Sequence, residues 1–336
     1  MELTVFWFIL ITVLFTGFFI LEGFDYGVGT LLPFMSDDDS DRRMVLRTIA
    51  PVWDGNEVWM ITAGGALFAA FPHVYATMFS AFYLALFLML LALILRGVAF
   101  ELRSRHESAS WRKGFDCAIF FGSFLPAILW GVAVADLIGG LPINDKMIYE
   151  GNFFNLLTPH SVLGGIAFLL VFAYHGASFL TIRLKEQHLL DKAKSIANKV
   201  GVAAIVAFVL FGAATVTMTD FGESALATLI LAVAAVAFVA GFSAMRKNCG
   251  KCSFIMSSAA IGLTTVAFFT ALFPRLMVSS LNPAFSLTIF NAASTDYTLS
   301  IMTKAALLLV PIVLLYQGFT YYIFRKRVSR EDLGEH

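Results

Sequence analysis

The sequence predicts an all-α integral membrane protein with nine transmembrane helices, the N-terminus outside and the C-terminus in the cytoplasm. Three observations support this prediction. The chain is 59% hydrophobic and only 14% charged, whereas soluble domains carry about 25% charged residues. Nine apolar stretches are long enough to cross a bilayer as helices. Lysine and arginine are concentrated in alternate connections between these stretches.

The nine stretches share a length of about 20 mostly apolar residues, which is what a membrane-crossing helix needs. They lie at residues 5–34, 48–72, 76–100, 115–139, 160–183, 200–219, 223–244, 253–274 and 300–324. Helices are expected because backbone groups in lipid must be satisfied within the segment. We predict two four-helix bundles plus one extra helix: residues 1–140 form the first bundle, 141–275 the second, and 276–336 an outer loop, the ninth helix and a cytoplasmic tail.

The basic residues orient these helices. Twenty Lys and Arg residues fall on one side of the predicted membrane, and only Lys146, Arg275 and Lys304 fall on the other. Cytoplasmic loops of membrane proteins carry an excess of Lys and Arg. The bias therefore places the C-terminus in the cytoplasm, and the alternation supports an odd number of spans. The zero net charge gives no basic surface for nucleic acid.

Acidic residues interrupt the first two predicted helices. Glu22 and Asp25 are three residues apart in the first, and so are Asp54 and Glu57 in the second. This spacing puts both members of a pair on one helix face. An ionisable side chain at the centre of a membrane helix costs roughly 3 kcal/mol or more, which favours a function. We interpret the four acids as a proton pathway starting at the cytoplasm, with Trp53 beside the second pair.

A structural role is the alternative interpretation of these acids. Arg96, near the inner end of the third predicted helix, is available as an ion-pair partner that would hold the bundle together. His175 is the histidine that lies clearly at membrane depth. Haem ligation by this imidazole is conceivable, but a buried histidine bonded to a neighbouring helix is commoner. The sequence contains no phosphate loop, dinucleotide fingerprint or zinc-protease motif.

One cysteine motif occurs in a short loop that is expected to face the cytoplasm. Cys249 and Cys252 enclose Gly and Lys in a single Cys-x-x-Cys arrangement. A lone motif of this kind, without a second pair, is a weak signal for a metal or redox site. An ordinary cytoplasmic loop is the favoured interpretation, and no metal ligand set is assigned.

Several motifs, in the same order, resemble subunit II of cytochrome bd quinol oxidases. The stretch Glu22-Gly-Phe-Asp-Tyr-Gly-Val-Gly29 is similar to the first-helix signature of that family. The stretch Pro51-Val-Trp-Asp-Gly-Asn-Glu-Val-Trp59 resembles its second-helix signature, of which Trp-Asp-Gly-Asn is the specific part. Weaker matches follow at Arg96–Glu101, Phe121–Pro126 and Gly151–Leu157. The resemblance extends over residues 5–332.

This resemblance implies a subunit of a respiratory terminal oxidase in a bacterial or archaeal plasma membrane. The haem-bearing subunit I would hold two b-type haems and haem d, oxidise quinol and reduce dioxygen to water. Subunit II would carry no haem or metal and no catalytic residue. It would stabilise subunit I, with a small single-helix subunit as a further possible partner, and help conduct cytoplasmic protons.

The resemblance also assigns residues. Asp25 matches the aspartate at the mouth of the family's proton path, and Asp54 and Trp53 match its Trp-Asp-Gly-Asn motif. Glu22 and Glu57 vary more within the family. Two other classes of function fit the acids. One is a proton-coupled secondary transporter, since intramembrane acids and repeats occur there too. The other is a purely structural membrane subunit, and a co-purifying partner with the spectrum of haem d would decide against the transporter.

Overall fold

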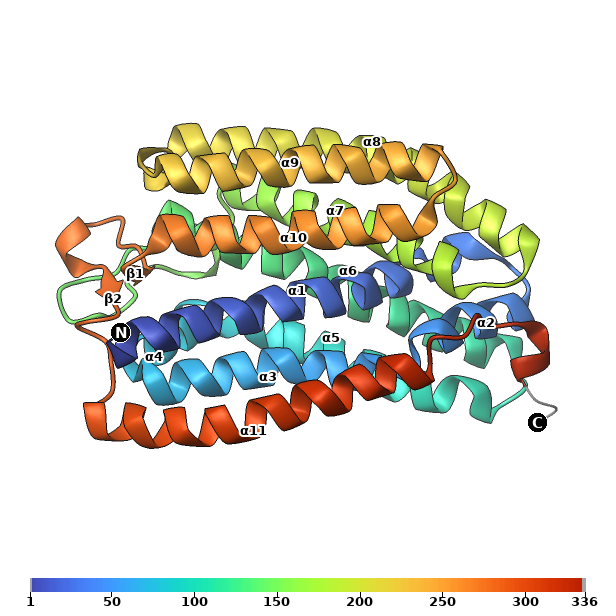
Figure 1. The fold of residues 1–336 in the computed structure, drawn as a ribbon, viewed down its shortest axis with the longest axis horizontal. Helices are drawn as coiled ribbons and strands as arrows, with labels where there is room; N and C mark the ends of the chain where they lie inside the picture. Colours follow the sequence, from blue (N-terminus) through green and yellow to red (C-terminus); the bar gives the residue numbers. More distant parts are fainter. Residues whose placement is uncertain (1, 334–336) are drawn as a thin grey trace.

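The computed structural model describes residues 2–333. They form a bundle of long helices whose axes lie roughly along the longest axis of the molecule (Figure 1). The helices are α1 (Leu3–Met35), α2 (Asp39–Ile49), α3 (Trp53–Ala70), α4 (Pro72–Ala81), α5 (Tyr83–Leu102), α6 (Ala109–Gly139), α7 (Pro159–Arg183), α8 (Gln187–Met218), α9 (Ala225–Arg246), α10 (Gly250–Leu272) and α11 (Asp296–Ile323). Two short antiparallel strands, β1 (Arg275–Met277) and β2 (Leu287–Thr288), lie in a loop before α11.

Eight of the described helices are long and apolar enough to cross a membrane, which agrees with the predicted class of all-α membrane protein. They are α1, α5 with the short turn that follows it, and α6 to α11. The 18-residue helix α3 lies beside α1 in the same bundle, but its first turns carry Asp54, Asn56 and Glu57. The count of nine therefore depends on whether α3 crosses the membrane, and it stays a prediction.

Two of the predicted spans are divided in the structure. The expected helix over 48–72 becomes α2 and α3, and the break falls at Ala50–Val52. Pro51 explains this break, because proline has no N–H to donate to the carbonyl one turn earlier in a continuing helix. The expected helix over 76–100 becomes α4 and α5, which meet at Phe82.

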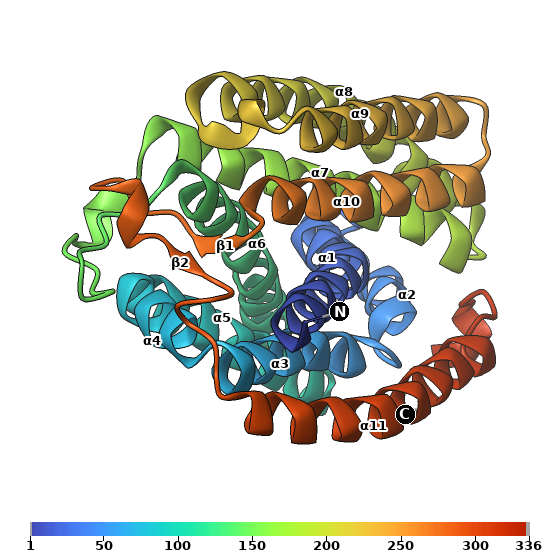
Figure 2. The same ribbon diagram turned by 60° about the vertical axis from the view of Figure 1, so that its left-hand side comes forward.

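Helix α1 occupies the centre of the bundle. It packs against α3, α6, α7 and α10, and Figure 2 shows it enclosed by them. Glycine allows the closest of these approaches: a Cβ atom on Gly27 would lie 2.0 Å from the backbone oxygen of Phe172. Gly176 faces Gly27 from the other side of the same contact. Because α1 contacts helices from both halves of the chain, the division into two bundles stays a prediction.

Helix α11 lies at the edge of the bundle, against α3 and α1 (Figure 2). Just before its first residue, Ser294 donates from its backbone N–H to the backbone oxygen of Ala70 over 2.9 Å. Trp7 of α1 donates to the Thr303 hydroxyl over 3.1 Å. Most of its remaining side chains are exposed, so lipid or another polypeptide covers this helix in a membrane.

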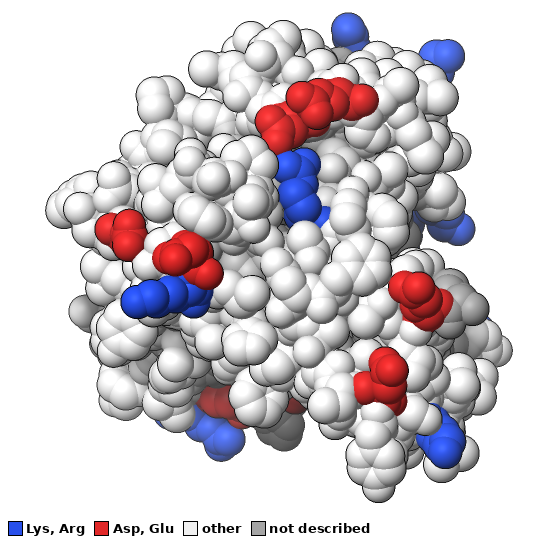
Figure 3. All heavy atoms as spheres, turned by 90° about the vertical axis from the view of Figure 1, so that its left-hand side faces the viewer, with Lys and Arg blue, Asp and Glu red and all other residues white. Residues whose placement is uncertain are grey.

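The two ends of the bundle differ in charge. The end that carries α2, which we call the α2 end, holds a network of ion pairs. There Asp116 accepts from Arg42 at 2.9 Å and from Arg103 at 2.5 Å, and Asp39 accepts from Arg103 at 3.0 Å and Arg112 at 2.8 Å. Figure 3 looks onto the opposite end, where few charged side chains are seen. The membrane orientation stays a prediction from the sequence.

Candidate functional site

The candidate site begins with two acids of α1, Glu22 and Asp25, whose side chains are both fully buried. Their burial follows from the central position of α1. The face of the helix that carries Gly27 packs tightly on α7. Asp25 is two residues away, which is roughly 200° around the helix, and so it points towards α3 instead.

A guanidinium from α5 joins two of the acids. Arg96 is fully buried, and its Nη2 atom donates to the carboxylates of both Glu22 on α1 and Glu57 on α3. The Arg96 Cζ atom also lies 4.8 Å from the centre of the Tyr26 ring. Gly122 of α6 makes room for this arrangement, because a Cβ atom there would be 2.5 Å from the Cβ of Arg96. Four helices, α1, α3, α5 and α6, thus meet at one buried arginine.

Asp25 is held by a different set of side chains. Asn56 of α3 donates from Nδ2 to Asp25 Oδ2 over 2.7 Å. The amide oxygen of Asn56 in turn accepts from the Tyr321 hydroxyl at 2.8 Å and from Gln317 at 3.4 Å. Trp59 donates its indole N–H to Gln317 over 2.7 Å. The hydrogen bonds therefore join α1, α3 and α11 around one carboxylate.

Sequence reasoning missed Asn56, Gln317 and Tyr321. A signal for the last two was present: they are four residues apart in an apolar stretch, so that both lie on one face of α11. Asn56 is the last residue of the Trp-Asp-Gly-Asn motif and lies between Asp54 and Glu57, the two acids that were assigned to the proton pathway. Which carboxylate it contacts depends on the packing of α3 against α1, which the sequence does not reveal.

Asp54 lies apart from the other acids. It is in the first turn of α3, at the α2 end, and its side chain is exposed. A carboxylate in the first turn of a helix is stabilised by the positive end of the helix dipole. The neighbouring Trp53 is half-buried and packs on Phe100, with ring centres 4.9 Å apart. The structure thus brings Glu22, Glu57 and Arg96 together, and leaves Asp54 on the surface of the same helix as Glu57.

Several buried polar atoms near Arg96 have no hydrogen-bond partner among the described residues. They are Glu22 Oε2, Asp25 Oδ1, Tyr26 OH, Arg96 Nε and Nη1, Thr30 Oγ1 and Ser123 Oγ. Buried polar groups are nearly always satisfied by protein or by ordered water.

His175 was the candidate for a haem ligand. Its Nδ1 atom lies 2.7 Å from the Ser257 hydroxyl, and its Nε2 atom lies 3.1 Å from the backbone oxygen of Ile20. The imidazole also stacks on Phe254, with ring centres 4.6 Å apart. With both ring nitrogens engaged by protein, this histidine does not fit the role of an axial ligand. Among the described residues, no group of three or more His, Cys, Asp or Glu side chains could hold a metal ion.

A large cavity lies elsewhere in the bundle. It has a volume of about 680 Å³, and its walls come from α1, α3, α4, α5, α6 and α10. Aromatic and aliphatic side chains such as Phe15, Met60 and Tyr83 line it, and none of the lining residues is acidic or basic. Its mostly apolar lining suits hydrocarbon.

Comparison with known proteins identifies the family. The model of the family described as cytochrome bd terminal oxidase subunit II matches residues 3–324. The chain belongs to the cytochrome bd oxidase subunit II family. It is 42% identical over 330 residues to cytochrome bd ubiquinol oxidase subunit 2 of Bacillus subtilis (strain 168), covering 97% of both chains. It is 35% identical over 363 residues to cytochrome bd-I ubiquinol oxidase subunit 2 of Escherichia coli (strain K12), covering 97% of this chain and 95% of that one.

A solved structure has the same fold. A chain of the bd oxidase from Geobacillus thermodenitrificans matches with a TM-score of 0.76 at 16% identity, covering 97% of this chain and 100% of that one. As a member of the bd oxidase subunit II family, the chain is a component of a respiratory terminal oxidase and belongs to a haem-containing complex with a partner oxidase subunit. Its eight span-capable helices and its family place it in a bacterial membrane as a multi-pass protein.

Proposed function

We propose that this chain is the haem-free subunit II of a quinol:oxygen oxidoreductase, and that it helps conduct cytoplasmic protons towards haem d in subunit I. Subunit I would hold the two b-type haems and haem d, oxidise the quinol and reduce dioxygen to water. Subunit II would stabilise it and contribute no catalytic residue. The observation that carries the proton role is the group of two fully buried acids, Glu22 and Asp25, and the partly accessible Glu57. Of these, Glu22 and Glu57 share the buried guanidinium of Arg96.

The charges of this group argue for bound protons. Three carboxylates and one guanidinium have a net charge of −2 when all are ionised. An uncompensated charge in a low-dielectric interior is strongly unfavourable. Two protons make the group neutral, and with three carboxylates available they can be shared in more than one way. A site that holds protons in several arrangements of similar charge is suited to passing them on.

The exposure of the acids suggests the direction of uptake. Asp54 is exposed at the α2 end, which the charge distribution assigns to the cytoplasm. The Glu57 side chain, three residues further along α3, is 18% accessible, and the Glu22 side chain is fully buried. In the proposed pathway Asp54 collects protons, Glu57 receives them, and Glu22 and Asp25 hold them in the interior, while Trp53 shields the first step from lipid.

Arg96 and Asn56 have positioning roles in this pathway. An amide has no readily exchangeable acidic proton, so Asn56 fixes the orientation of Asp25 without relaying protons itself. The Arg96 guanidinium stays charged and keeps Glu22 and Glu57 close together. Protons taken from the cytoplasm and consumed at haem d would make the reaction electrogenic.

The haem-free role is supported by His175, whose two ring nitrogens are engaged by Ser257 and Ile20. The stabilising role is supported by the largely exposed α11, which offers a long apolar surface for contact within the membrane.

The experiment compares charge-removing variants in the intact oxidase complex. Glu57→Gln and Asp25→Asn should each slow quinol oxidation and slow proton uptake from the cytoplasmic side by about tenfold, which corresponds to about 1.4 kcal/mol of lost stabilisation in the rate-limiting step. The reduced spectrum should show unchanged haem content. Asp145→Asn is the matched control, because Asp145 is an exposed residue in the loop between α6 and α7.

The outcomes distinguish the proton pathway from a purely structural role and from a transporter. Normal turnover in both variants would contradict the proton pathway. Loss of haem from the complex in both would support the structural interpretation, in which Arg96 and its acids only hold the helices. Purification of the chain without a partner that shows the haem d spectrum would favour a proton-coupled transporter.

A further inference from the structure

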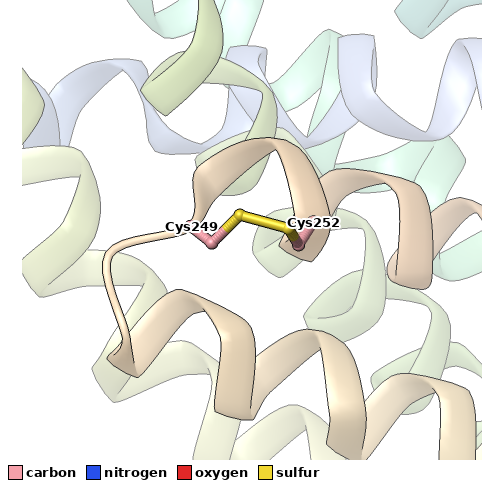
Figure 4. Close-up of a disulfide and its surroundings, with 2 residues drawn as sticks. All are labelled: Cys249 and Cys252. Atoms are coloured by element: carbon pink, nitrogen blue, oxygen red, sulfur yellow. A yellow bond between two sulfur atoms is a disulfide. The ribbon is translucent and has the colours of Figure 1, made fainter.

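Cys249 and Cys252 lie at the start of α10, remote from the acids of the proposed proton pathway in the sequence and bonded to none of them. The structure joins them in a disulfide across which the Cα atoms are 5.4 Å apart (Figure 4). We propose that this pair is a thiol–disulfide exchange site that reacts with low-molecular-weight thiols and disulfides of the cytoplasm. The inference rests on the proposed membrane orientation and is independent of the proton pathway.

The position of the pair is the first argument. The connection between α9 and α10 lies at the α2 end of the bundle (Figure 1) and carries Arg246, Lys247 and Lys251. Connections rich in Lys and Arg face the cytoplasm, where thiol pools make permanent disulfides rare. Disulfides found in that compartment are mostly transient, being catalytic or redox-sensing. A metal is the other common use of paired cysteines, and no third ligand lies near enough among the described residues.

The local electrostatics favour reactive thiols. Cys249 immediately precedes the first residue of the 23-residue helix α10, and Cys252 is its third residue. The positive end of a helix dipole and nearby lysines both stabilise a thiolate, which is the nucleophile in exchange reactions. Lys251 lies between the two cysteines, and Lys247 lies just before them. The pair therefore combines the Cys-x-x-Cys spacing with a cationic surrounding.

Exposure decides which sulfur reacts first. Cys252 is exposed, whereas Cys249 is half-buried. In the oxidising direction, the Cys252 thiolate attacks a low-molecular-weight disulfide, forms a mixed disulfide and releases one thiolate. The Cys249 thiolate then attacks the Cys252 sulfur and releases the second thiolate. Two electrons pass from the two protein thiols to the small disulfide, which leaves as two thiols once each thiolate has taken a proton. The reverse sequence reduces the protein.

The surrounding backbone stays in place without the sulfur–sulfur bond. Ser253, next to Cys252, has its hydroxyl 2.7 Å from that of Tyr174 and 3.0 Å from that of Ser178. Gly250 packs directly on Thr181, because a Cβ atom at Gly250 would lie 2.1 Å from the Thr181 hydroxyl oxygen. These contacts hold the start of α10 against α7. The reduced thiols therefore remain within reach of each other, which makes the couple reversible.

The experiment measures the thiols in the intact oxidase complex in sealed membrane vesicles. A Cys117→Ala background removes the remaining free cysteine of the described chain, which is exposed on α6. Vesicles are equilibrated with reduced and oxidised glutathione at a series of ratios, and then treated with a membrane-impermeant maleimide. We expect two labels per chain in reduced inside-out vesicles and loss of both in oxidised ones. Right-side-out vesicles should give none.

Single variants test the order of attack. With oxidised glutathione, Cys249→Ser should trap a mixed disulfide on the exposed Cys252 several-fold faster than Cys252→Ser traps one on Cys249. Two labels at every glutathione ratio, no label after full reduction, or labelling from the outer side only would each overturn the proposal. Equal trapping rates would overturn the assigned order. Because labelling does not require turnover, these failures are distinguishable from failure of the proton pathway.

Discussion

Asn56 donates a 2.7 Å hydrogen bond to Asp25 and thereby joins α3 to α1 at the buried centre of the site. Its amide oxygen is held in turn by the Tyr321 hydroxyl at 2.8 Å. The two contacts use opposite ends of one amide, so that Tyr321 fixes which end faces the acid. The orientation of a carboxylate on the first helix is thus controlled from the last helix.

This relationship can be tested by removing the donor on α11. Tyr321→Phe should reduce turnover of the oxidase complex by about two- to threefold, because it removes one hydrogen bond and about 0.5 kcal/mol is the lower end of what such a bond contributes. Asn56→Leu should have a larger effect, about tenfold, because it leaves Asp25 without its donor. Tyr322→Phe is the matched control, since Tyr322 is exposed and its ring faces Arg325. Equal turnover in Tyr321→Phe and Tyr322→Phe would contradict the role given to Tyr321.

Removal of the buried cation should destabilise the chain. Arg96→Leu leaves Glu22 and Glu57 without their shared partner, and breaking a buried ion pair costs about 3–5 kcal/mol. We expect a lower thermal stability and a lower yield of assembled complex. Combining Arg96→Leu with Glu22→Gln and Glu57→Gln should restore much of the stability, because no unpaired charge remains among the three.

The same experiment separates stability from proton transfer. The triple variant should assemble but turn over slowly, since two of the proposed proton-holding groups are gone. Arg105→Leu removes an exposed arginine and should leave both properties unchanged. A triple variant as unstable as Arg96→Leu alone would show that the unpaired charges of Glu22 and Glu57 are not what destabilises Arg96→Leu.

The contact between α1 and α7 should tolerate no side chain at its centre. Gly27→Ala places a methyl group 2.0 Å from the Phe172 backbone oxygen, so the helices must separate. Overpacking of this kind costs about 1–3 kcal/mol and should lower the Tm of the purified complex. Gly318→Ala is the control: nothing lies within 4 Å of a Cβ atom there. Since glycine in a helix is about 1 kcal/mol less favourable than alanine, that variant should be neutral or more stable.

The C-terminal tail should respond to acid. Ser329 donates to Asp332 Oδ2 from its backbone N–H at 2.7 Å and from its hydroxyl at 2.9 Å. These bonds lower the pKa of the Asp332 carboxyl below its ordinary value of 3.8. Because the folded-state pKa is lowered, the stabilisation is complete above the unfolded value and is lost as the pH falls through the folded one.

Hydrogen exchange of residues 328–333, corrected for its intrinsic pH dependence, measures this response. Protection should be present at neutral pH and should disappear below pH 3.8. In Asp332→Asn the protection should be weak both at neutral pH and in acid. Unchanged protection in acid would mean that the tail is held by other contacts, such as the backbone bond from Val328 to Arg183 at 2.7 Å.

Much of this architecture could be predicted from the sequence. Apolar stretches and the distribution of basic residues predicted the class of protein and most of its helices. Glu22, Asp25 and Glu57 were predicted as site residues, because a charge at membrane depth is costly and therefore indicates a function. The family was predicted from motifs and confirmed by comparison. The individual proton roles stay predictions.

The rest depended on packing. Asp54 is two residues from Asn56, which bonds Asp25, so it lies within about one helical turn of Asp25 along the bundle. The sequence could not show that the Asp54 side chain faces outwards and is exposed, while Asn56 faces Asp25. The hydrogen bonds from Tyr321 and Gln317 reach Asn56 across 265 and 261 residues of sequence. Polar residues so far apart in a chain reveal their partnership only when the fold brings α11 against α3.

The late position of α11 has a consequence for biosynthesis. Helices α1, α3 and α5 leave the ribosome before α11 and can bring Glu22, Glu57 and Arg96 together in the membrane without it. Tyr321 emerges after them, so the Asn56 amide gains its contact with Tyr321 later than its contact with Asp25. A nascent chain that stalls before α11 would contain the ion pairs of Arg96 with Glu22 and Glu57 but would leave Asp25 poorly oriented.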